Sequence, residues 1–301
     1  MKSVPGYPKI LTLGASYTEN ALVGPVIIQE KIDGSLFGFG VNDDDELVFR
    51  SKGATIAKEY PPKMFKDAVD HVCSLDTSLL GRDCYFYCEC LEKPKHNVLK
   101  YNHIPTNHLV LFDALVEGVW LDKYALELMA EVIGIDIIPE LYRGSATVDT
   151  IKSLLDTESY LGGETIEGVV VKNYAQTVAL GGMFFPLFTK YVRETFKERH
   201  NTEWKFNSSK VSIQEWINGF ASEARWQKAI QHLEEAGKLS RSPKDIGSLI
   251  RIVQEDVKEE EGENIRRYLY NHFIGDIVRK SIVGLPEWYK QKLLESLVEG
   301  E

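Results

Sequence analysis

A lysine followed closely by an aspartate and a glycine lies in the segment of this sequence with the clearest chemical potential. Positions 30–35 read Glu-Lys-Ile-Asp-Gly-Ser and follow the apolar run 26–28, a pattern typical of a strand that ends in a turn. Alternate residues of a strand share a face, so Lys31 and Asp33 are expected to point the same way. A lysine amine is a covalent nucleophile only without its proton, so neighbouring cations or desolvation must lower its ordinary pKa of about 10.4. Taken alone, the pattern favours a solvated lysine at a strand end.

Four further short segments place polar side chains where a strand would carry apolar ones. In chain order they contain Arg50, Glu89, Glu167 with Lys172, and Lys190. Each segment alone is weak, because Glu89 suits an edge strand and Lys172 suits a solvated strand end. Together with Lys31, in this order and spacing, they indicate one shared site.

The pattern of apolar residues predicts the elements that must position these side chains. Strands are predicted within 26–50 and over 84–91, 109–114, 166–172 and 186–192, with helices over 63–73, 121–133 and 153–161. After about Trp204, glycine and proline become rarer and a 3.6-residue period takes over, and Ser242-Pro243 marks the start of one helix. The sequence therefore predicts an α+β protein, with sheets and helices over residues 1–204 and an all-helical domain over 205–301.

Composition describes an ordinary globular protein of two domains. The 301 residues are 44% hydrophobic and 27% charged. The net charge of −10 argues against indiscriminate nucleic-acid binding but leaves room for a local basic groove. Positive charge concentrates in two clusters, each of which alone favours a solvated face. The clusters are Lys52, Lys58, Lys63 and Lys66, and Lys190, Arg193, Lys197 and Arg199.

The sequence favours a cytoplasmic protein that does not enter a membrane. It has no run of about 18 apolar residues, and its first residues lack the apolar core of a secretion signal. Three of its four cysteines, Cys84, Cys88 and Cys90, share a strand-like stretch without the turn spacing or the histidines of a zinc site. Reduced, buried thiols are therefore expected, as in the cytoplasm.

In their order and spacing, the five polar segments resemble those of the covalent nucleotidyltransferases, which include ATP-dependent ligases and capping guanylyltransferases. The resemblance covers about residues 20–200. Within this superfamily the chain looks most like the RNA ligase 2 family, because Glu30 precedes Lys31 and Leu-Phe-Asp stands at 111–113. The helical pattern after Lys190 agrees, since DNA ligases and capping enzymes carry a β-barrel there. The resemblance implies an ATP-grasp-like ligase domain of antiparallel sheets with helices, followed by a small helical domain that binds RNA.

For the nucleotide, the resemblance implies a role for each of five residues. Lys31 would attack the α-phosphate of ATP and form a lysyl-AMP intermediate. Glu30 would accept from the exocyclic amine of adenine, and Phe112 would stack on the ring, which is compatible with a position in the core. Asp33 belongs to the same nucleotide-binding segment, and Glu89 would bind the ribose hydroxyls.

On the phosphate side, the resemblance implies cations and metal ligands. Arg50 would contact the nucleotide or the RNA 5′-phosphate, and Lys172 and Lys190 would face the phosphates. A leaving pyrophosphate carries several negative charges, so Mg²⁺, or Mn²⁺ in its place, must help to neutralise them. Glu167 and Glu89 would supply oxygen ligands to this metal, directly or through water.

Two features depart from the family's pattern. The last segment usually carries two lysines separated by one residue, but Phe188 stands at the first place, so Lys172 or Arg193 would have to supply the missing charge. In a regular strand Glu167 and Lys172 face opposite sides, so either a bulge re-aims one of them or Lys172 acts from the strand end. If neither holds, Lys172 is structural.

The predicted function is an ATP-dependent RNA ligase that joins 3′-hydroxyl and 5′-phosphate ends through lysyl-AMP and RNA-adenylate intermediates. The expected partner is nicked or duplex-guided RNA, as in RNA repair, and the expected state is a monomer. Three alternatives stay open: an ATP-dependent DNA ligase with an unusual tail, an mRNA-capping guanylyltransferase, and a nucleic-acid-binding module without catalysis. In the helical tail, Trp204, Lys205 and Trp226 are candidates for RNA contact, and packing is an equally good role for the tryptophans.

Overall fold

The computed structural model describes residues 3–15, 17–180, 183–193 and 213–298. The chain divides into two compact units, Met1–Val253 and Gln254–Glu301. The domain boundary predicted between residues 204 and 205 lies outside the described residues and stays a prediction. The α+β class is confirmed, because sheets form the first part of the chain and helices alone follow them.

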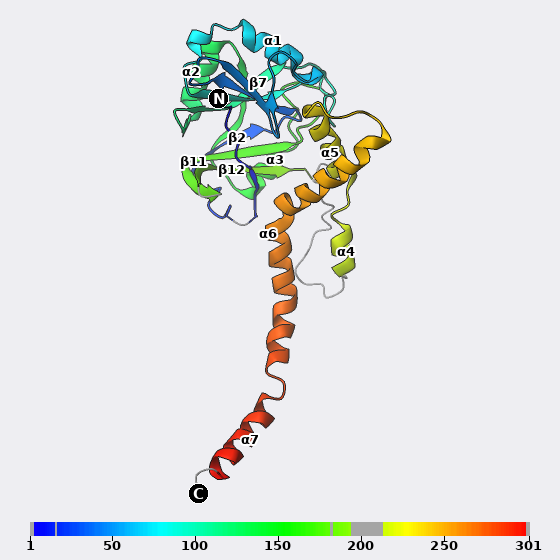
Figure 1. The fold of residues 1–301 in the computed structure, drawn as a ribbon. Coiled ribbons are helices and arrows are strands. Elements are labelled where there is room, and N and C mark those ends of the chain that lie inside the picture. The colour runs from blue at the N-terminus through cyan, green and yellow to red at the C-terminus, as the bar shows by residue number, and fades with distance from the viewer. Residues whose placement is uncertain (1–2, 16, 181–182, 194–212, 299–301) are drawn as a thin grey trace. The chain divides into compact units, whose positions relative to one another are not determined.

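The first sheet combines antiparallel strands with one short parallel strand (Figure 1). Its order is β1 (Leu11–Thr12), β12 (Met183–Val192), β11 (Gly168–Leu180), β2 (Pro25–Glu30) and β10 (Glu140–Ser145). Ile28 of β2 lies opposite Val171 of β11, and both are fully buried in the core beneath α3 (Val148–Leu154). The helix predicted over 153–161 is wrong, because the capping box of Thr147 starts α3 earlier in the chain.

The second sheet carries most of the aromatic core. Its order is β5 (Thr55–Ile56), β4 (Leu47–Ser51), β3 (Ser35–Val41), β6 (Cys84–Cys90), β7 (Leu109–Val116) and β8 (Val119–Trp120), with β9 (Asp136–Ile137) also paired to β7. The helices α1 (Lys66–Ser74) and α2 (Lys123–Ile133) contribute to its buried core. Phe37 and Phe39 on β3 meet Phe65 and Phe86, and these rings fix the position of the strand that begins after the lysine segment.

Four helices form the described part of the tail: α4 (Ile213–Asn218), α5 (Glu223–Glu235), α6 (Ile246–Ser281) and α7 (Leu285–Val298). The helix start predicted at Ser242-Pro243 is confirmed, because Ser242 and Asp245 form a capping box ahead of α6. Helices α4 and α5 belong to the first compact unit, and α7 belongs to the second. Within the described residues, no helix combines the length and the apolarity that a bilayer crossing needs.

Candidate active site

Lys31 and Glu167 meet at the ends of two paired strands. Lys31 directly follows β2 and Glu167 directly precedes β11, and the backbone N–H of Lys31 donates to the carbonyl of Gly168 over 2.9 Å. A Cβ atom at Gly168 would lie 2.4 Å from the carbonyl oxygen of Tyr191, so only glycine lets β12 approach this closely. The Lys31 Nζ lies 2.6 Å from Glu167 Oε2, and both side chains keep some exposure, 29% and 13%. The pair therefore faces an accessible site.

Negative charge dominates the surroundings of Lys31. Burial alone would lower the pKa of its amine, but the charges of Glu167, Glu89 and Asp33 outweigh burial and raise it. Burial raises the pKa of the Glu167 carboxyl, against the opposing charges of Lys31 and Lys190. Lys31 is consequently held as an ammonium in the ligand-free site. A lysine amine acts as a nucleophile only after it loses this proton, which requires a change in the charge balance.

Asp33 anchors a loop in this structure. Its Oδ2 accepts hydrogen bonds from the backbone N–H groups of Val98 and Leu99, both over 2.7 Å, and its own N–H donates to the hydroxyl of Tyr101. The prediction that Lys31 and Asp33 share one face of a strand is wrong, because β2 ends at Glu30 and the chain turns there. The segment 30–35 therefore orders the loop that follows β6.

Glu89 lies against the turn that follows Lys31. A Cβ atom at Gly34 would lie 3.0 Å from Glu89 Oε2 and equally close to the carbonyl of Cys90, so a glycine permits the contact. Oε2 is buried and has no hydrogen-bond partner among the described residues. Burial raises the pKa of Glu89 to about 8, although the charge of Lys31 opposes the shift. This carboxylate oxygen is available to accept from a ligand.

Glu30 supplies a second acceptor of the same kind. It is 2% exposed, and its Oε2 accepts from the backbone N–H of Tyr160 over 3.1 Å. Its Oε1 is buried and, within the part of the chain that is described, accepts no hydrogen bond. Burial raises the pKa of this carboxyl as well. Since a buried acceptor without a donor costs about 1–3 kcal/mol, both Glu30 and Glu89 favour a ligand that donates.

Lys172 belongs to a buried cluster. Its Nζ donates to Asp113 Oδ1 over 2.7 Å and to the carbonyl of Phe112 over 2.5 Å, while the hydroxyl of Tyr7 donates to the other oxygen of Asp113. The side chains of Lys172 and Asp113 are 3% and 1% exposed. Lys172 lies inside β11, and the irregular register of β11 comes only after Asn173. Neither a bulge before Lys172 nor a strand end re-aims it, so by the condition set above Lys172 has a structural role.

Lys172 lies beside Phe188, which occupies the first place of the expected lysine pair. They lie opposite each other on β12 and β11, and the Lys172 Nζ is 5.2 Å from the Phe188 ring centre. Lys190 lies opposite Val170, so Phe188, Lys172 and Lys190 share one face of the sheet. Arg193 instead pairs with Asp156 over 2.9 Å. Of the two side chains expected to replace the missing charge, Lys172 is the one beside Phe188.

Phe112 and Arg50 both contact the N-terminal segment. The Phe112 ring is 9% exposed and meets the ring of Tyr7 edge-on at 5.1 Å. Arg50 donates through Nη1 to the carbonyl of Val4 over 2.7 Å and through Nε to the carbonyl of Ser51. These contacts hold both residues in defined positions, and their predicted contacts with nucleotide or RNA stay predictions.

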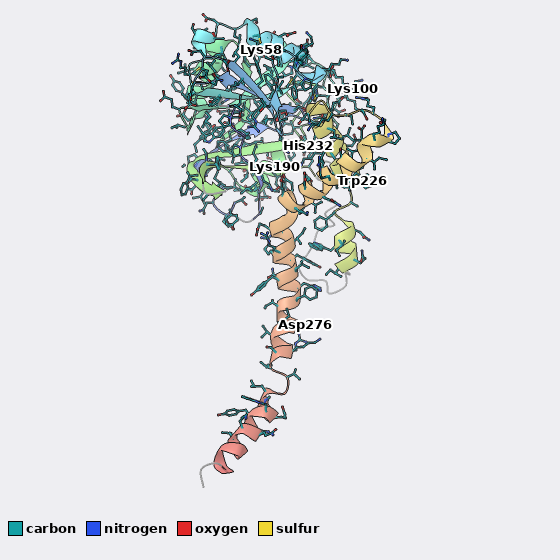
Figure 2. All side chains as sticks on the ribbon, in the orientation of Figure 1. Lys58, Lys100, Lys190, Trp226, His232 and Asp276 are labelled. Carbon is teal, nitrogen blue, oxygen red and sulfur yellow. The ribbon has the colours of Figure 1, made fainter. Side chains whose placement is uncertain are left out.

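Several residues beside the site were missed by sequence reasoning. They are Tyr7, His96, Tyr160, Gln231 and Glu235. Gln231 and Glu235 lie about two hundred positions after Lys31, so no local pattern links them to it. Trp226 on α5 is 53% exposed (Figure 2), which suits the predicted RNA contact better than a place in the core. Trp204, Lys205, Lys197 and Arg199 lie outside the described residues.

A family profile and solved structures both resemble this chain. The RNA ligase family profile matches residues 24–192, more than half of the chain. No curated protein sequence matches. Among solved structures, Naegleria gruberi RNA ligase with PPi is 14% identical and aligns with a TM-score of 0.50, covering 64% of this chain and 57% of that one. A mutant of the same ligase with ATP and Mn has the same identity and TM-score, with coverages of 65% and 60%.

These structural matches support the fold, and this chain spans about three fifths of the length of the Naegleria ligase. The family match supports more than the fold. The matched stretch, residues 24–192, contains the lysine segment, Glu89, Glu167 and Lys190. By that match over more than half its length, this chain belongs to the RNA ligase family.

Proposed function

We propose that this protein is an ATP-dependent RNA ligase with Lys31 as its nucleophile. One observation carries the proposal: an accessible lysine lies 2.6 Å from Glu167, follows Glu30 in the chain and feels the charge of Glu89, and these last two carboxylates each keep a buried oxygen without a donor. The family match supports it, as does the likeness to a ligase studied with ATP and Mn.

The unsatisfied oxygens suit a nucleotide, and adenine in particular. The exocyclic amine of adenine is a donor that would satisfy Glu30 Oε1, whereas guanine presents a carbonyl oxygen at the same ring position, and two acceptors would face each other. A ribose hydroxyl would satisfy Glu89 Oε2. The choice of base thus separates a ligase that uses ATP from a capping enzyme that uses GTP.

In the proposed reaction, the Lys31 amine gives up a proton, which Glu167 at 2.6 Å is placed to accept, and attacks the α-phosphorus of ATP. A phosphorus–nitrogen bond forms, the bond to the β-phosphate oxygen breaks, and pyrophosphate leaves. The AMP then passes to an RNA 5′-phosphate, and a 3′-hydroxyl displaces the AMP to close the phosphodiester. Lys190, on the same face of the sheet as Phe188, is the proposed positive charge on the phosphate side, and Lys172, paired with Asp113, keeps a structural role.

A divalent cation is part of the proposal, although the described residues bring no three His, Cys, Asp or Glu side chains together as a metal cluster, so two carboxylates, the phosphates and water would hold it. Glu167 and Glu89 have the hard oxygen atoms that Mg²⁺ or Mn²⁺ prefers and would hold the ion directly or through water. When bound, it would neutralise part of the pyrophosphate charge and reduce the negative potential that keeps Lys31 protonated. The proposal also includes nicked or duplex-guided RNA as substrate, a role in repair, a monomeric state and a cytoplasmic location.

Covalent labelling tests the proposal. The protein is incubated with Mg²⁺ and either α-³²P-ATP or α-³²P-GTP, and label that survives on a denaturing gel is measured. Label from ATP, absent in Lys31→Ala, is the expected result. Label from GTP would support capping, and no label from either nucleotide would support a module without catalysis. Nicked duplexes with RNA or DNA on the 3′-hydroxyl side then separate an RNA ligase from a DNA ligase.

A further inference from the structure

Helix α5 contacts the turn that directly follows the nucleophile. Gln231 Nε2 lies 3.3 Å from the carbonyl oxygen of Gly34, 3.2 Å from Ser35 Oγ and 2.8 Å from Glu235 Oε1. Ser35 is 1% exposed and Glu235 is 4% exposed. Helix and turn belong to the same compact unit, although about two hundred residues separate them in the sequence. The contact is a polar one between a partly buried amide and buried partners, and buried polar groups require matched donors and acceptors.

The loop after β6 holds the same turn from its other side. The backbone N–H of Glu92 donates to His96 Nδ1 over 3.0 Å, so the ring proton must lie on Nε2, which donates to Ser35 Oγ over 2.9 Å. Asn97 Nδ2 donates to the carbonyl of Gly34 over 2.9 Å. The carbonyl of Gly34 and the hydroxyl oxygen of Ser35 therefore each accept one bond from the loop and one from α5.

The hydroxyl proton of Ser35 completes the network. Because Ser35 Oγ already accepts from His96 and Gln231, its proton is free to be donated to the carboxylate of Glu235. The Gly34 carbonyl and the Ser35 hydroxyl are then held from both sides, with the two hydrogens of Gln231 Nε2 shared among Gly34, Ser35 and Glu235, and such a network favours a single geometry. The turn leads back within three residues to Lys31, and its Gly34 touches Glu89. A shift of α5 would therefore shift the nucleophile.

We propose that Gln231 and Glu235 are positioning residues for the transfer of AMP to Lys31. Helix α5 is then part of the adenylation site and does more than bind RNA. The inference rests on the proposed function, since it assumes that Lys31 is adenylated. It also accounts for the acidic side chain of Glu235, which is buried beside the turn where an apolar residue would pack without a network, and for the partly buried amide of Gln231.

The test is a matched pair of substitutions on one helix. Gln231→Met keeps the length of the side chain but removes its donors, and Gln227→Met makes the same change at an exposed position one turn earlier. Single-turnover self-adenylation is measured against ATP concentration. Gln231→Met is expected to lower the maximal rate by about tenfold to a hundredfold, the cost of a small misplacement of a reacting group, with the KM for ATP changed by less than about twofold. Gln227→Met is expected to match the wild type.

A second pair separates positioning from general stability. Glu235→Gln keeps an acceptor for Ser35, and Glu235→Ala removes it, so the glutamine variant is expected to retain most of the maximal rate and the alanine variant to lose it. Sealing of a pre-adenylated RNA, which bypasses attack by Lys31, is expected to fall much less than self-adenylation in Gln231→Met. An equal loss in both steps would show a merely structural role and overturn the inference.

The outcomes also separate this inference from the proposed function. A wild-type protein that takes no label from ATP refutes the proposed function and, with it, the inference. A labelled wild type with Gln231→Met equal to Gln227→Met refutes the inference alone.

Discussion

Two lysine–carboxylate pairs at the first sheet show how the same residue types serve opposite purposes. Lys31 and Glu167 lie 2.6 Å apart with side chains 29% and 13% exposed, whereas Lys172 and Asp113 lie 2.7 Å apart with side chains 3% and 1% exposed. Distance does not distinguish the pairs. Their surroundings do, because the first pair borders carboxylate oxygens without donors and the second is enclosed by its own partners.

The charge balance of the two pairs explains the difference. Glu167, Glu89 and Asp33 all act on the Lys31 ammonium, so negative charge is in excess and the site favours the arrival of a cation. Around Lys172, one carboxylate meets one ammonium, and Tyr7 and the carbonyl of Phe112 complete the hydrogen bonds. The Lys31–Glu167 pair, with its excess of negative charge, is suited to chemistry. The Lys172–Asp113 pair, with its charges balanced and its hydrogen bonds made, is suited to holding the two sheets together.

Removal of the Lys31 amine is expected to have the largest effect on function. Lys31→Ala should abolish covalent labelling by ATP, because no nucleophile remains. The free energy of unfolding should change by about 1 kcal/mol or less, since the pair is partly accessible to solvent. Denaturing gels and denaturant melts measure the two quantities. Labelling of Lys31→Ala at the wild-type level would refute the site assignment.

Removal of the buried Lys172 ammonium is expected to lower the stability of the protein, which Lys31→Ala leaves nearly unchanged. Lys172→Met should lower the free energy of unfolding by about 3–5 kcal/mol, because Asp113 would remain buried without its partner. Adding Asp113→Asn should recover much of this loss, since the buried charge is then gone as well. Denaturant melts of the single and double variants measure this. A Lys172→Met variant with wild-type stability and no labelling would instead make Lys172 a catalytic group.

A change at Glu30, the acceptor next to Lys31 in the chain, is expected to have a smaller effect, on the KM for ATP. Glu30→Gln keeps the size of the side chain and an acceptor for the N–H of Tyr160 but removes the charge. The KM for ATP in self-adenylation should rise by about tenfold, which is the difference between a charge-assisted hydrogen bond and a neutral one. Titration with ATP measures the change. An unchanged KM would exclude Glu30 from the adenine contact.

A dependence of stability on pH is expected from Glu89, visible only without nucleotide or metal. The pKa of Glu89 is raised by burial to about 8 in the folded protein, above its ordinary value of about 4.5. A raised carboxyl pKa means that the stability present below the unfolded value is lost as pH rises toward 8. Glu89→Gln should therefore have a higher Tm than the wild type at pH 9 and a closer Tm at pH 5, without nucleotide or metal. If the Tm values of the two proteins changed with pH in parallel, the raised pKa of Glu89 would be contradicted.

Local patterns predicted the strands and most of the helices, because burial of one face imposes a period that is visible in the residues themselves. The order of the polar segments likewise led to Lys31, Glu89 and Glu167, since each lies at or beside a strand that its own apolar residues form. The helix predicted over 153–161 was misplaced. Its start is set by the capping residue Thr147, and the apolar period does not change there.

The sequence by itself determined the fold class, the candidate nucleophile and the family, all of which depend on residue type and order along the chain. Only the tertiary structure decided that Asp33 holds a loop, that Lys172 is enclosed by Asp113, and that α5 reaches the turn at Ser35. Such contacts join positions far apart in the chain. Whether a charge is satisfied depends on which groups surround it in space, and no local period records that.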